Sequence, residues 1–443
     1  MLPIRLGDVV RPGRMTATDV SDDRGRHPVI GMLPWPDRFE DFHDKVGISL
    51  EDFRDRLSGT WLFNFVEALR SAGTRPVLYF FSARIRGPVR FTHASTGVPV
   101  RVLPSPWLHR KMQGAGDRFD IRSRMYRSAL SYVATPWIRL AGELRRDRCG
   151  AILCQEYEYA RSDEAFVLGR LLRVPVFATF QGANQPGSVL ERPFRKVAIR
   201  RAAGLIAGSR AEIDRVRREY GVPAERTAWI PNAFDVRRWK PVDRSAARSA
   251  LGIPPDVPVV VWHGRVEVHS KGLDLLVDAW RSVCAARVGR AQLLLLIGSA
   301  QDDEELRRSL AGLPDGTVRW DDRFVLDRDV LWRYLSAADI AVRPSRNEGF
   351  SVALVEAMSC ALPIVAIEAS GVAEALGDDV GIVIPRGDAA ALAEAIGRLL
   401  DDETLRRGLG QRARRRAQES FSVEVVGAQL RAFLEDRGLL VPS

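Results

Sequence analysis

Short apolar runs alternate along this chain with longer segments whose apolar residues recur at helical spacing. Val29–Leu33 is an uninterrupted apolar run, Trp61–Ser71 places its apolar residues on one helical face, and Pro76–Phe81 is apolar again. Strands that are apolar at nearly every position are typical of parallel sheets that helices cover on both faces. The pattern therefore predicts βαβ units.

The alternation is interrupted once, near the middle of the chain. Trp229–Phe234 is the last predicted strand of the first series, and the polar stretch Asp235–Arg248 suits a linker between domains. The alternation restarts at Val257–Trp262. Two successive series of β/α units predict an α/β protein with two doubly wound parallel sheets. Ligands are expected between the halves, where the carboxyl ends of both sheets meet.

Two segments depart from the regular alternation. Trp35–Leu57 is charged and rich in aromatic residues, so we expect an insertion that runs over the surface, whereas Phe119–Arg146 is expected to be one long helical region. A chain of 443 residues fits two domains of about 200 residues each. The predicted division is a flexible tail at 1–28, a first Rossmann-like domain at 29–234, a second at 235–420 and a C-terminal helix within 421–443.

The composition is that of a soluble globular protein. Hydrophobic residues make up 46% of the chain, and no apolar run reaches the ~18 residues that a membrane span needs. The first residues are polar and charged and contain no apolar signal core, so a cytoplasmic location is expected. The four cysteines and six histidines show no spacing typical of zinc ligands, so no metal site is predicted.

The net charge of +10 comes from arginine, which is clustered in Arg195–Arg201 and again in Arg406–Arg416. One interpretation is solvated helix faces encoded by a high-GC genome. The other is an anionic partner, such as a phospho-sugar, a lipid-linked acceptor or the inner face of a membrane. Nucleic acid is not expected as a partner, because the sequence contains no recognition module and no basic–aromatic array.

Two cations follow the first strand of the second series. Gly264 allows close backbone approach at the end of that strand, and Arg265 and Lys271 come next, on the loop and at the helix start. Such a pair at the carboxyl edge of a sheet could neutralise a diphosphate as its charge grows. The alternative is a solvated basic loop.

The run Arg343–Val365, RPSRNEGFSVALVEAMSCALPIV, reads as strand, loop, helix and strand. Glu348–Ser351 would place backbone amides at a helix N-terminus, where they can hold phosphate, and Glu348 could accept hydrogen bonds from sugar hydroxyls. Glu356 lies within the helix and could accept from both hydroxyls of a ribose. The alternative is a capping carboxylate followed by an exposed helix glutamate, but the helix is otherwise apolar. Glu356 therefore needs a donor partner.

Polar groups also follow strands of the first series. Ser58, Gly59 and Thr60 open a helix with their amides directed out of the carboxyl edge of the sheet. Glu156 lies two residues after the strand Ala151–Cys154, near its carboxyl end, so it could face the cleft and contact an acceptor. A surface loop is the alternative for this residue.

Residues 339–387 closely resemble the signature of the retaining family 4 glycosyltransferases, whose GT-B fold is two Rossmann-like domains facing a cleft. The resemblance covers most of residues 29–420. It implies a nucleotide-diphospho-sugar donor in the second domain, an acceptor in the first, no required metal or cofactor, and retention of anomeric configuration. It extends to further short motifs, namely Gly264–Arg265, Lys271–Gly272, Pro231–Asn232 and Ser58–Gly59.

The resemblance implies a role for each matched residue of the second domain. Glu348 contacts the donor sugar, Arg265 and Lys271 contact the diphosphate, and Glu356 contacts the ribose. The donor-binding residues implied in this way are Gly264, Arg265, Lys271, Gly298, Glu348, Gly349, Phe350, Ser351 and Glu356. The donor is expected to be a UDP- or GDP-sugar.

The first domain departs from the family at one position. After the strand Val174–Phe180 the family often has a histidine, whereas this chain has Gln181. The resemblance implies that Gln181 takes its place in the catalytic set, together with Glu348, Arg265 and Lys271. The acceptor-side candidates are Ser58, Gly59, Thr60, Glu156, Gln181 and Gly182. The C-terminal helix Val423–Arg437 is expected to pack back on the first domain.

The expected function is transfer of a sugar to the hydroxyl of a saccharide, a lipid-linked acceptor or a small-molecule glycoside. Two alternatives stay open. One is a nucleotide-sugar-binding protein without catalytic activity, which the replacement of the family histidine by Gln181 would suit. The other is a different enzyme of the same fold, such as a sugar epimerase.

Overall fold

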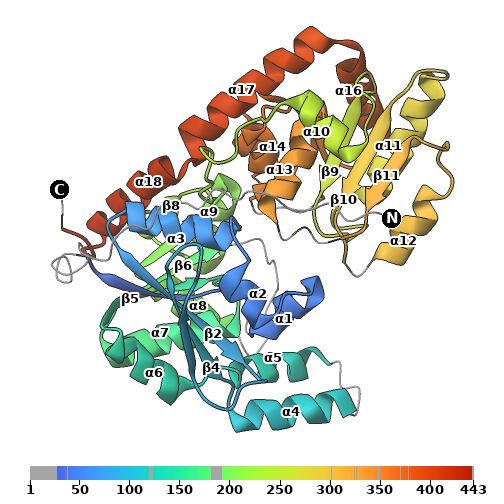
Figure 1. Cartoon of the computed structure of the whole chain (residues 1–443). Helices are drawn as coiled ribbons and strands as arrows, with labels where there is room; N and C mark the ends of the chain where they lie inside the picture. Colours follow the sequence, from blue (N-terminus) through green and yellow to red (C-terminus); the bar gives the residue numbers. More distant parts are fainter. Residues whose placement is uncertain are drawn as a thin grey trace, which may run out of the picture.

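The computed structural model contains the two parallel sheets that the sequence predicts (Figure 1). It describes residues 27–36, 38–118, 123–180, 192–300, 302–323, 325, 327–346, 350–369, 371–377 and 379–441. The predicted tail, apart from its last two residues, lies outside these ranges.

The described part of the first half contains an eight-stranded sheet in the order β3-β4-β2-β1-β5-β6-β7-β8. The pairs are parallel except for β3, which runs antiparallel to β4. The order reverses between β1 and β5, and open α/β sheets bind ligands at such a point. The strands are β1 (Val29–Leu33), β2 (Arg75–Ser82), β3 (Val89–Thr92), β4 (Pro99–Pro104), β5 (Cys149–Gln155), β6 (Val176–Phe180), β7 (Gly204–Ala207) and β8 (Thr227–Trp229).

The second half has a sheet of six parallel strands in its described residues, in the order β11-β10-β9-β12-β13-β14. Its order reverses between β9 and β12, which gives this half a switch point of its own. The strands are β9 (Val259–His263), β10 (Leu293–Ile297), β11 (Val318–Asp321), β12 (Ile340–Arg343), β13 (Ile364–Ile367) and β14 (Gly381–Ile384).

Helices cover both faces of each sheet (Figure 1). Those of the first half are α1 (Phe39–His43), α2 (Leu50–Asp55), α3 (Trp61–Ser71), α4 (Trp107–Arg118), α5 (Arg124–Tyr132), α6 (Trp137–Arg146), α7 (Ala160–Leu172), α8 (Arg192–Arg201) and α9 (Arg210–Tyr220), with 3₁₀ turns at Asp44–Val46 and Ala224–Arg226. The remaining helices are α10 (Arg244–Leu251), α11 (Leu273–Ala286), α12 (Asp303–Leu310), α13 (Arg328–Ala337), α14 (Val352–Ser359), α15 (Val372–Leu376), α16 (Ala389–Asp401), α17 (Glu403–Phe421) and α18 (Val423–Asp436).

This double cover explains the apolar runs of the sequence. Every residue of β1 and of β9 is buried, because successive side chains point to opposite faces and both faces are packed. In β1, Ile30 contributes to an apolar cluster on one face, whereas Val29 and Leu33 contribute to a cluster on the other. The prediction of two doubly wound α/β domains is therefore confirmed.

The prediction of a surface insertion at Trp35–Leu57 is wrong. This segment folds into α1, a 3₁₀ turn and α2, and Phe53 is fully buried against Phe80 of β2, with their ring centroids 5.1 Å apart. Arg54 and Asp55 of this segment are exposed and pair with each other at 2.6 Å. The charges of the segment are visible in the sequence, whereas the burial of Phe39 and Phe53 depends on their contacts with Phe80 of β2.

Three smaller boundaries also differ from the predictions. The helical region predicted at Phe119–Arg146 breaks before α6, where Pro136 has no N–H to donate. The last strand of the first half ends at Trp229, shortly before Pro231. The expected linker is partly helical, because α10 begins within it at Arg244 and continues beyond its end. Arg248 of this helix is buried and pairs with Asp339 at 2.6 Å.

The chain crosses between the halves twice. After α17 it turns at Ser422, and α18 lies against α3 of the first half (Figure 1). The two crossings are hydrogen-bonded to each other, since the amide of Phe234 donates to the carbonyl of Phe421 at 2.7 Å. At Gly427 the helices approach so closely that a Cβ would lie 2.7 Å from Cβ of Ser71.

We expect the substitution Gly427→Ala to destabilise the protein by ~1–3 kcal/mol, because the added methyl group overpacks the contact between α18 and α3. The measurement is the unfolding midpoint in denaturant. The matched control is Gly397→Ala in α16, where a Cβ meets nothing within 4 Å. This control should be neutral or stabilising by ~0.5–1 kcal/mol, since alanine favours the helix. Equal midpoints for the two variants would contradict the close approach.

Candidate functional site

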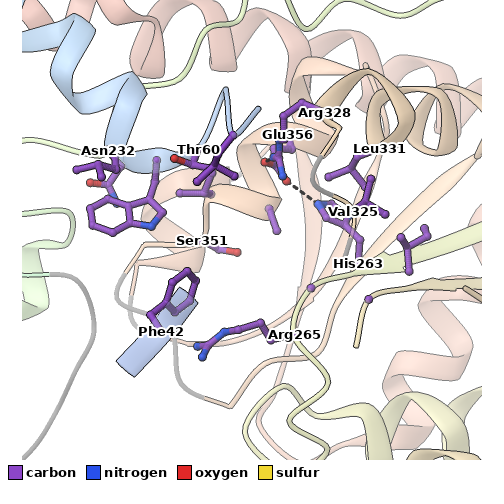
Figure 2. A pocket seen from close by; sticks show the side chains of 18 of the residues that line it. Phe42, Thr60, Asn232, His263, Arg265, Val325, Arg328, Leu331, Ser351 and Glu356 are labelled. Atoms are coloured by element: carbon purple, nitrogen blue, oxygen red, sulfur yellow. Dashed lines mark hydrogen bonds and ion pairs between the residues drawn. The ribbon is translucent and has the colours of Figure 1, made fainter. Parts of the chain in front are cut away.

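A cavity of about 350 Å³ lies between the carboxyl ends of the two sheets. On one side it is lined by residues that end β9, β10 and β12, such as His263, Ile297 and Arg343. On the other it is lined by Trp35, which follows β1, and by Phe80 of β2. Figure 2 shows side chains of both halves directed into the same space. A molecule bound here would touch both domains.

Two glycines bring the loops of the second half close together. Gly298 has a φ of +138°, and a Cβ on it would lie 1.8 Å from the carbonyl oxygen of Gly264. The amide of Gly264 in turn donates to the carbonyl of Ile297 at 3.0 Å. Any side chain at Gly298 would force these loops apart, so the floor of the cavity requires glycine there.

Two cations line the cavity beside this floor. Arg265 and Lys271 both border it, and Arg265 pairs with Glu267 at 2.9 Å. The turn after Lys271 is fixed, because a Cβ at Gly272 would lie 2.0 Å from the carbonyl oxygen of Pro344. The loop that carries Lys271 therefore packs against the chain that follows β12. Both positive charges are held at the edge of the second sheet.

The carboxylate of Glu356 is the centre of a buried polar network. Glu356 lies on α14, is only 3% exposed, and accepts a hydrogen bond at 2.7 Å from Nε2 of His263 (Figure 2). Its other oxygen forms an ion pair with Arg328 at the start of α13. Arg343 braces the histidine: its guanidinium donates to Nδ1 of His263, to the backbone carbonyl of His263 and to the carbonyl of Ala353.

This network determines the protonation of His263. Burial and the nearby cations Arg343 and Arg328 hold the pKa of His263 well below its usual value. Because Arg343 can only donate, Nδ1 must accept, and the single proton lies on Nε2, where it points to Glu356. His263 is thus neutral, and its hydrogen bond orients the charged carboxylate of Glu356.

Arg328 lies where the two halves meet. Its Cγ would be 3.2 Å from a Cβ placed on Gly59, which has a φ of +64°. Its guanidinium also lies over the ring of Trp239, 5.1 Å from the centroid. Burial lowers the pKa of Arg328 to about 10, so the side chain stays positive at neutral pH. One buried cation thus links Glu356 to the loop before α3.

Two family models match consecutive parts of this chain. The model described as Glycosyltransferase Family 4 matches residues 58–238, and the model described as Glycosyl transferases group 1 matches residues 257–402. Together they span well over half of the 443 residues. The chain belongs to the family 4 glycosyltransferases. The two matched regions meet at the cavity described above.

Curated relatives carry glycosyltransferase names. A GDP-mannose-dependent monoacylated alpha-(1-6)-phosphatidylinositol monomannoside mannosyltransferase of Corynebacterium glutamicum is 33% identical over 216 residues, which is 46% of this chain and 55% of the relative. A D-inositol 3-phosphate glycosyltransferase of Nocardia farcinica is 28% identical over 247 residues, 53% of each chain. The chain spans about half the length of these relatives.

Solved structures share the fold over nearly the whole chain. The HepE protein of Anabaena in complex with UDP-glucose superposes with a TM-score of 0.67 at 19% identity, covering 92% of this chain and 100% of that one. A sucrose-phosphate synthase of Thermosynechococcus elongatus gives a TM-score of 0.67 at 22% identity, covering 91% and 97%. This likeness concerns the GT-B architecture alone.

Most of the described site residues that the sequence predicts line the cavity. Phe350, Ser351 and Glu356 line the cavity together with the predicted glycines and cations of the second half, and Thr60 lines it from the first half. Among the described residues, the predicted candidates Ser58, Gly59 and Glu156 are not part of the cavity wall, although Gly59 contacts Arg328. Glu156 is fully buried at the end of β5. Four predicted residues lie outside the described part of the chain, namely Glu348, Gly349, Gln181 and Gly182.

Sequence reasoning gave no role to the partners of Glu356. Arg343 and His263 carried a signal, because each is the polar end of a strand that is otherwise apolar and fully buried. Arg328 carried no such signal, because the first residue of an amphipathic helix looks in the sequence like an ordinary surface arginine. Its burial depends on Trp239 and Gly59, which are remote from it in sequence.

The described residues form neither a metal-binding cluster nor a membrane-spanning helix. They contain no group of three or more histidine, cysteine, aspartate or glutamate side chains that could hold a metal ion. None of the helices that they form is long and apolar enough to cross a bilayer.

We expect the His263 imidazole to stay neutral, with its proton on Nε2, between about pH 5 and 8, where an ordinary histidine titrates. The measurement is a histidine ¹⁵N–¹H correlation spectrum, with His263→Asn to assign the signal. The unfolded chain takes up a proton at His263 near pH 6.5 that the folded protein does not, so this residue makes stability fall as the pH drops below that value. The variant should lose that part of the pH dependence. A His263 signal titrating near pH 6.5 would refute the network.

Proposed function

We propose that this chain transfers a sugar from a nucleotide-diphospho-sugar donor to an acceptor hydroxyl, with retention of anomeric configuration. One observation carries the proposal: Arg265 and Lys271 border the same cavity as Ser351 at the start of α14, and the first half closes the opposite side. Cations and helix-start amides in one site suit a diphosphate that gains charge as its bond to the sugar breaks.

The first turn of α14 supports the binding of a phosphate. Ser351 is the N-cap of this helix, but its hydroxyl does not accept a hydrogen bond from the helix amides. Those amides and the positive end of the helix dipole would favour an anion at this point. Glu356 lies further along the same helix, where it would accept from the ribose hydroxyls behind the phosphates. We propose that Glu356 loses part of its contact with Arg328 when the ribose binds.

The donor is inferred from relatives. The corynebacterial relative is named as GDP-mannose-dependent, and HepE was solved with UDP-glucose and with UDP. A UDP- or GDP-sugar is therefore the proposed donor. The relatives' names include a phosphatidylinositol mannoside and an inositol 3-phosphate as the molecules acted upon, which supports a hydroxyl-bearing acceptor in general terms.

Retention is proposed to occur by attack on the face of the sugar that the phosphate leaves. Among the described residues that line the cavity, Glu356 is the one carboxylate, and both of its oxygens are engaged by His263 and Arg328. It is therefore poorly suited to form a covalent bond to the sugar. In this mechanism the departing phosphate takes the proton of the acceptor hydroxyl, and Lys271 and Arg265 stabilise the charge on that phosphate.

Replacing Lys271 by alanine should lower kcat for transfer by about 100-fold or more, because one fixed cation at the leaving phosphate is lost. The measurement is nucleotide release at saturating donor. Arg281→Ala is the matched control, since it removes an exposed cation of α11 whose ion pair, with Asp278, lies on the surface. This control should retain full activity. Near-normal turnover of the Lys271 variant, with an unchanged melting temperature, would contradict the proposed role of Lys271 in sugar transfer.

Binding alone can be tested with a panel of UDP-, GDP-, ADP- and TDP-sugars in a thermal-shift assay. We expect one base to raise Tm in proportion to the logarithm of ligand concentration, because ligand binding to the folded state stabilises it. Lys271→Ala should abolish most of that shift. A shift without transfer or hydrolysis of the donor would favour a non-catalytic binding protein, and conversion of the donor sugar to an isomer would favour an epimerase.

A further inference from the structure

The wall that the first half contributes to the cavity bears on the acceptor. Among the described residues that line the cavity from this half, none carries a charge at neutral pH. Most are aromatic or aliphatic, and burial lowers the pKa of His43, the one titratable group among them, to about 4. The fixed positive charges of the site, Arg265, Lys271, Arg328 and Arg343, all belong to the other half.

The aromatic side chains of this wall form a packed layer. Trp35 and Phe42 are half-buried, with ring centroids 5.8 Å apart and planes tilted by 59°. Behind them, Phe53 and Phe80 are buried and in edge contact at 5.1 Å. Because these rings support one another, the shape of the wall is set before any ligand arrives. It is the segment Trp35–Leu57, folded inward, that supplies most of it.

Phe42 is placed opposite the proposed phosphate site. The guanidinium of Arg265 lies 6.0 Å from the centroid of its ring, and Figure 2 shows the side chain of Arg265 reaching towards Phe42. A sugar held by the phosphates would therefore meet an aromatic surface. An anionic group on the acceptor would enter against that surface and lose its hydration, and no cation stands among the described residues of this wall to replace it.

An acceptor with an apolar face avoids this cost. The C–H face of a sugar ring and the face of an aryl group both pack well on aromatic side chains, and they gain from the removal of apolar surface from water. Hydroxyl groups also have a use here, because the indole N–H of Trp35 is buried and makes no hydrogen bond in the structure. A neutral oxygen beside that ring would give it an acceptor.

We propose that the acceptor is an uncharged molecule that lays an apolar face, from a sugar ring or an aryl group, against Phe42 and Trp35, and that phosphorylated acceptors are excluded. This rests on the proposed function. It sets the chain apart from the relatives whose names include an inositol 3-phosphate. Specificity would arise because the described residues of this wall include no cation. With Arg265 and Lys271 engaged by the donor phosphates, a buried phosphate on the acceptor would lack a counter-charge.

The test uses the full chain saturated with the nucleoside diphosphate that the thermal-shift panel identifies. Binding of four probes is measured by calorimetry: phenyl β-D-glucopyranoside, methyl β-D-glucopyranoside, D-glucose 6-phosphate and inositol 3-phosphate. We expect both glucosides to bind at least about tenfold more tightly than either phosphate. Tighter binding of the phenyl compound would indicate an aryl group on the wall, and equal binding a sugar face. A phosphate that binds as well as the glucosides, or glucosides that do not bind at all, would overturn the proposal.

A pair of variants separates the wall from the donor site. Phe42→Arg places a cation on the wall, so it should weaken glucoside binding by about tenfold and admit glucose 6-phosphate, whereas Phe42→Leu should keep the preference for neutral probes. Unchanged probe preference in the arginine variant would also overturn the proposal. Nucleotide binding is measured on the same samples. Its absence in the unmodified chain refutes the proposed function, whereas a preference for phosphates with nucleotide binding intact refutes only this inference.

Discussion

The buried carboxylate of Glu356 is the constraint on which the site depends. A charge taken out of water is costly unless partners replace its hydration, and here His263 and Arg328 do so from β9 and α13. Arg343 then fixes the histidine from β12. Four elements of the second half are thereby locked in register around one side chain. Removing Arg328 would leave the buried carboxylate without its counter-charge, and removing His263 would leave one of its oxygens without a hydrogen-bond donor.

The balance of this network also determines the electrostatics of the cavity. Arg328 and Arg343 are positive, Glu356 is negative and His263 is neutral, so the buried set carries one excess positive charge beside Arg265 and Lys271. The described residues that line the cavity from the first half carry no charge. The cavity therefore has one strongly positive side and one apolar side, and a substrate that is charged at one end only will orient itself between them.

The sequence predicts those features that local pattern controls. Parallel strands buried on both faces have a distinct composition, so both sheets were predictable, and Lys271, Ser351 and Glu356 follow from short motifs at strand ends. Features that depend on distant contacts were not predictable. The charges of Arg54 and Asp55 suggested a surface segment, while the contact of Phe53 with Phe80 decided its place. Arg328 became a buried residue for the same reason, through Trp239, which is distant in sequence, and through Gly59 of the other half.

The return of the last helix has a consequence for how this molecule is made. Val426, Leu430 and Phe433 of α18 belong to the same apolar cluster as Ile30 and Phe65 of the first half. A ribosome delivers those early residues long before the late ones, and domains ordinarily fold in that order as the chain emerges. Here the core of the first half stays unfilled until α18 has been translated, which happens after the whole second sheet. The first half is thus completed after the second, and during that interval its exposed α3 face is the surface that a chaperone would have to cover.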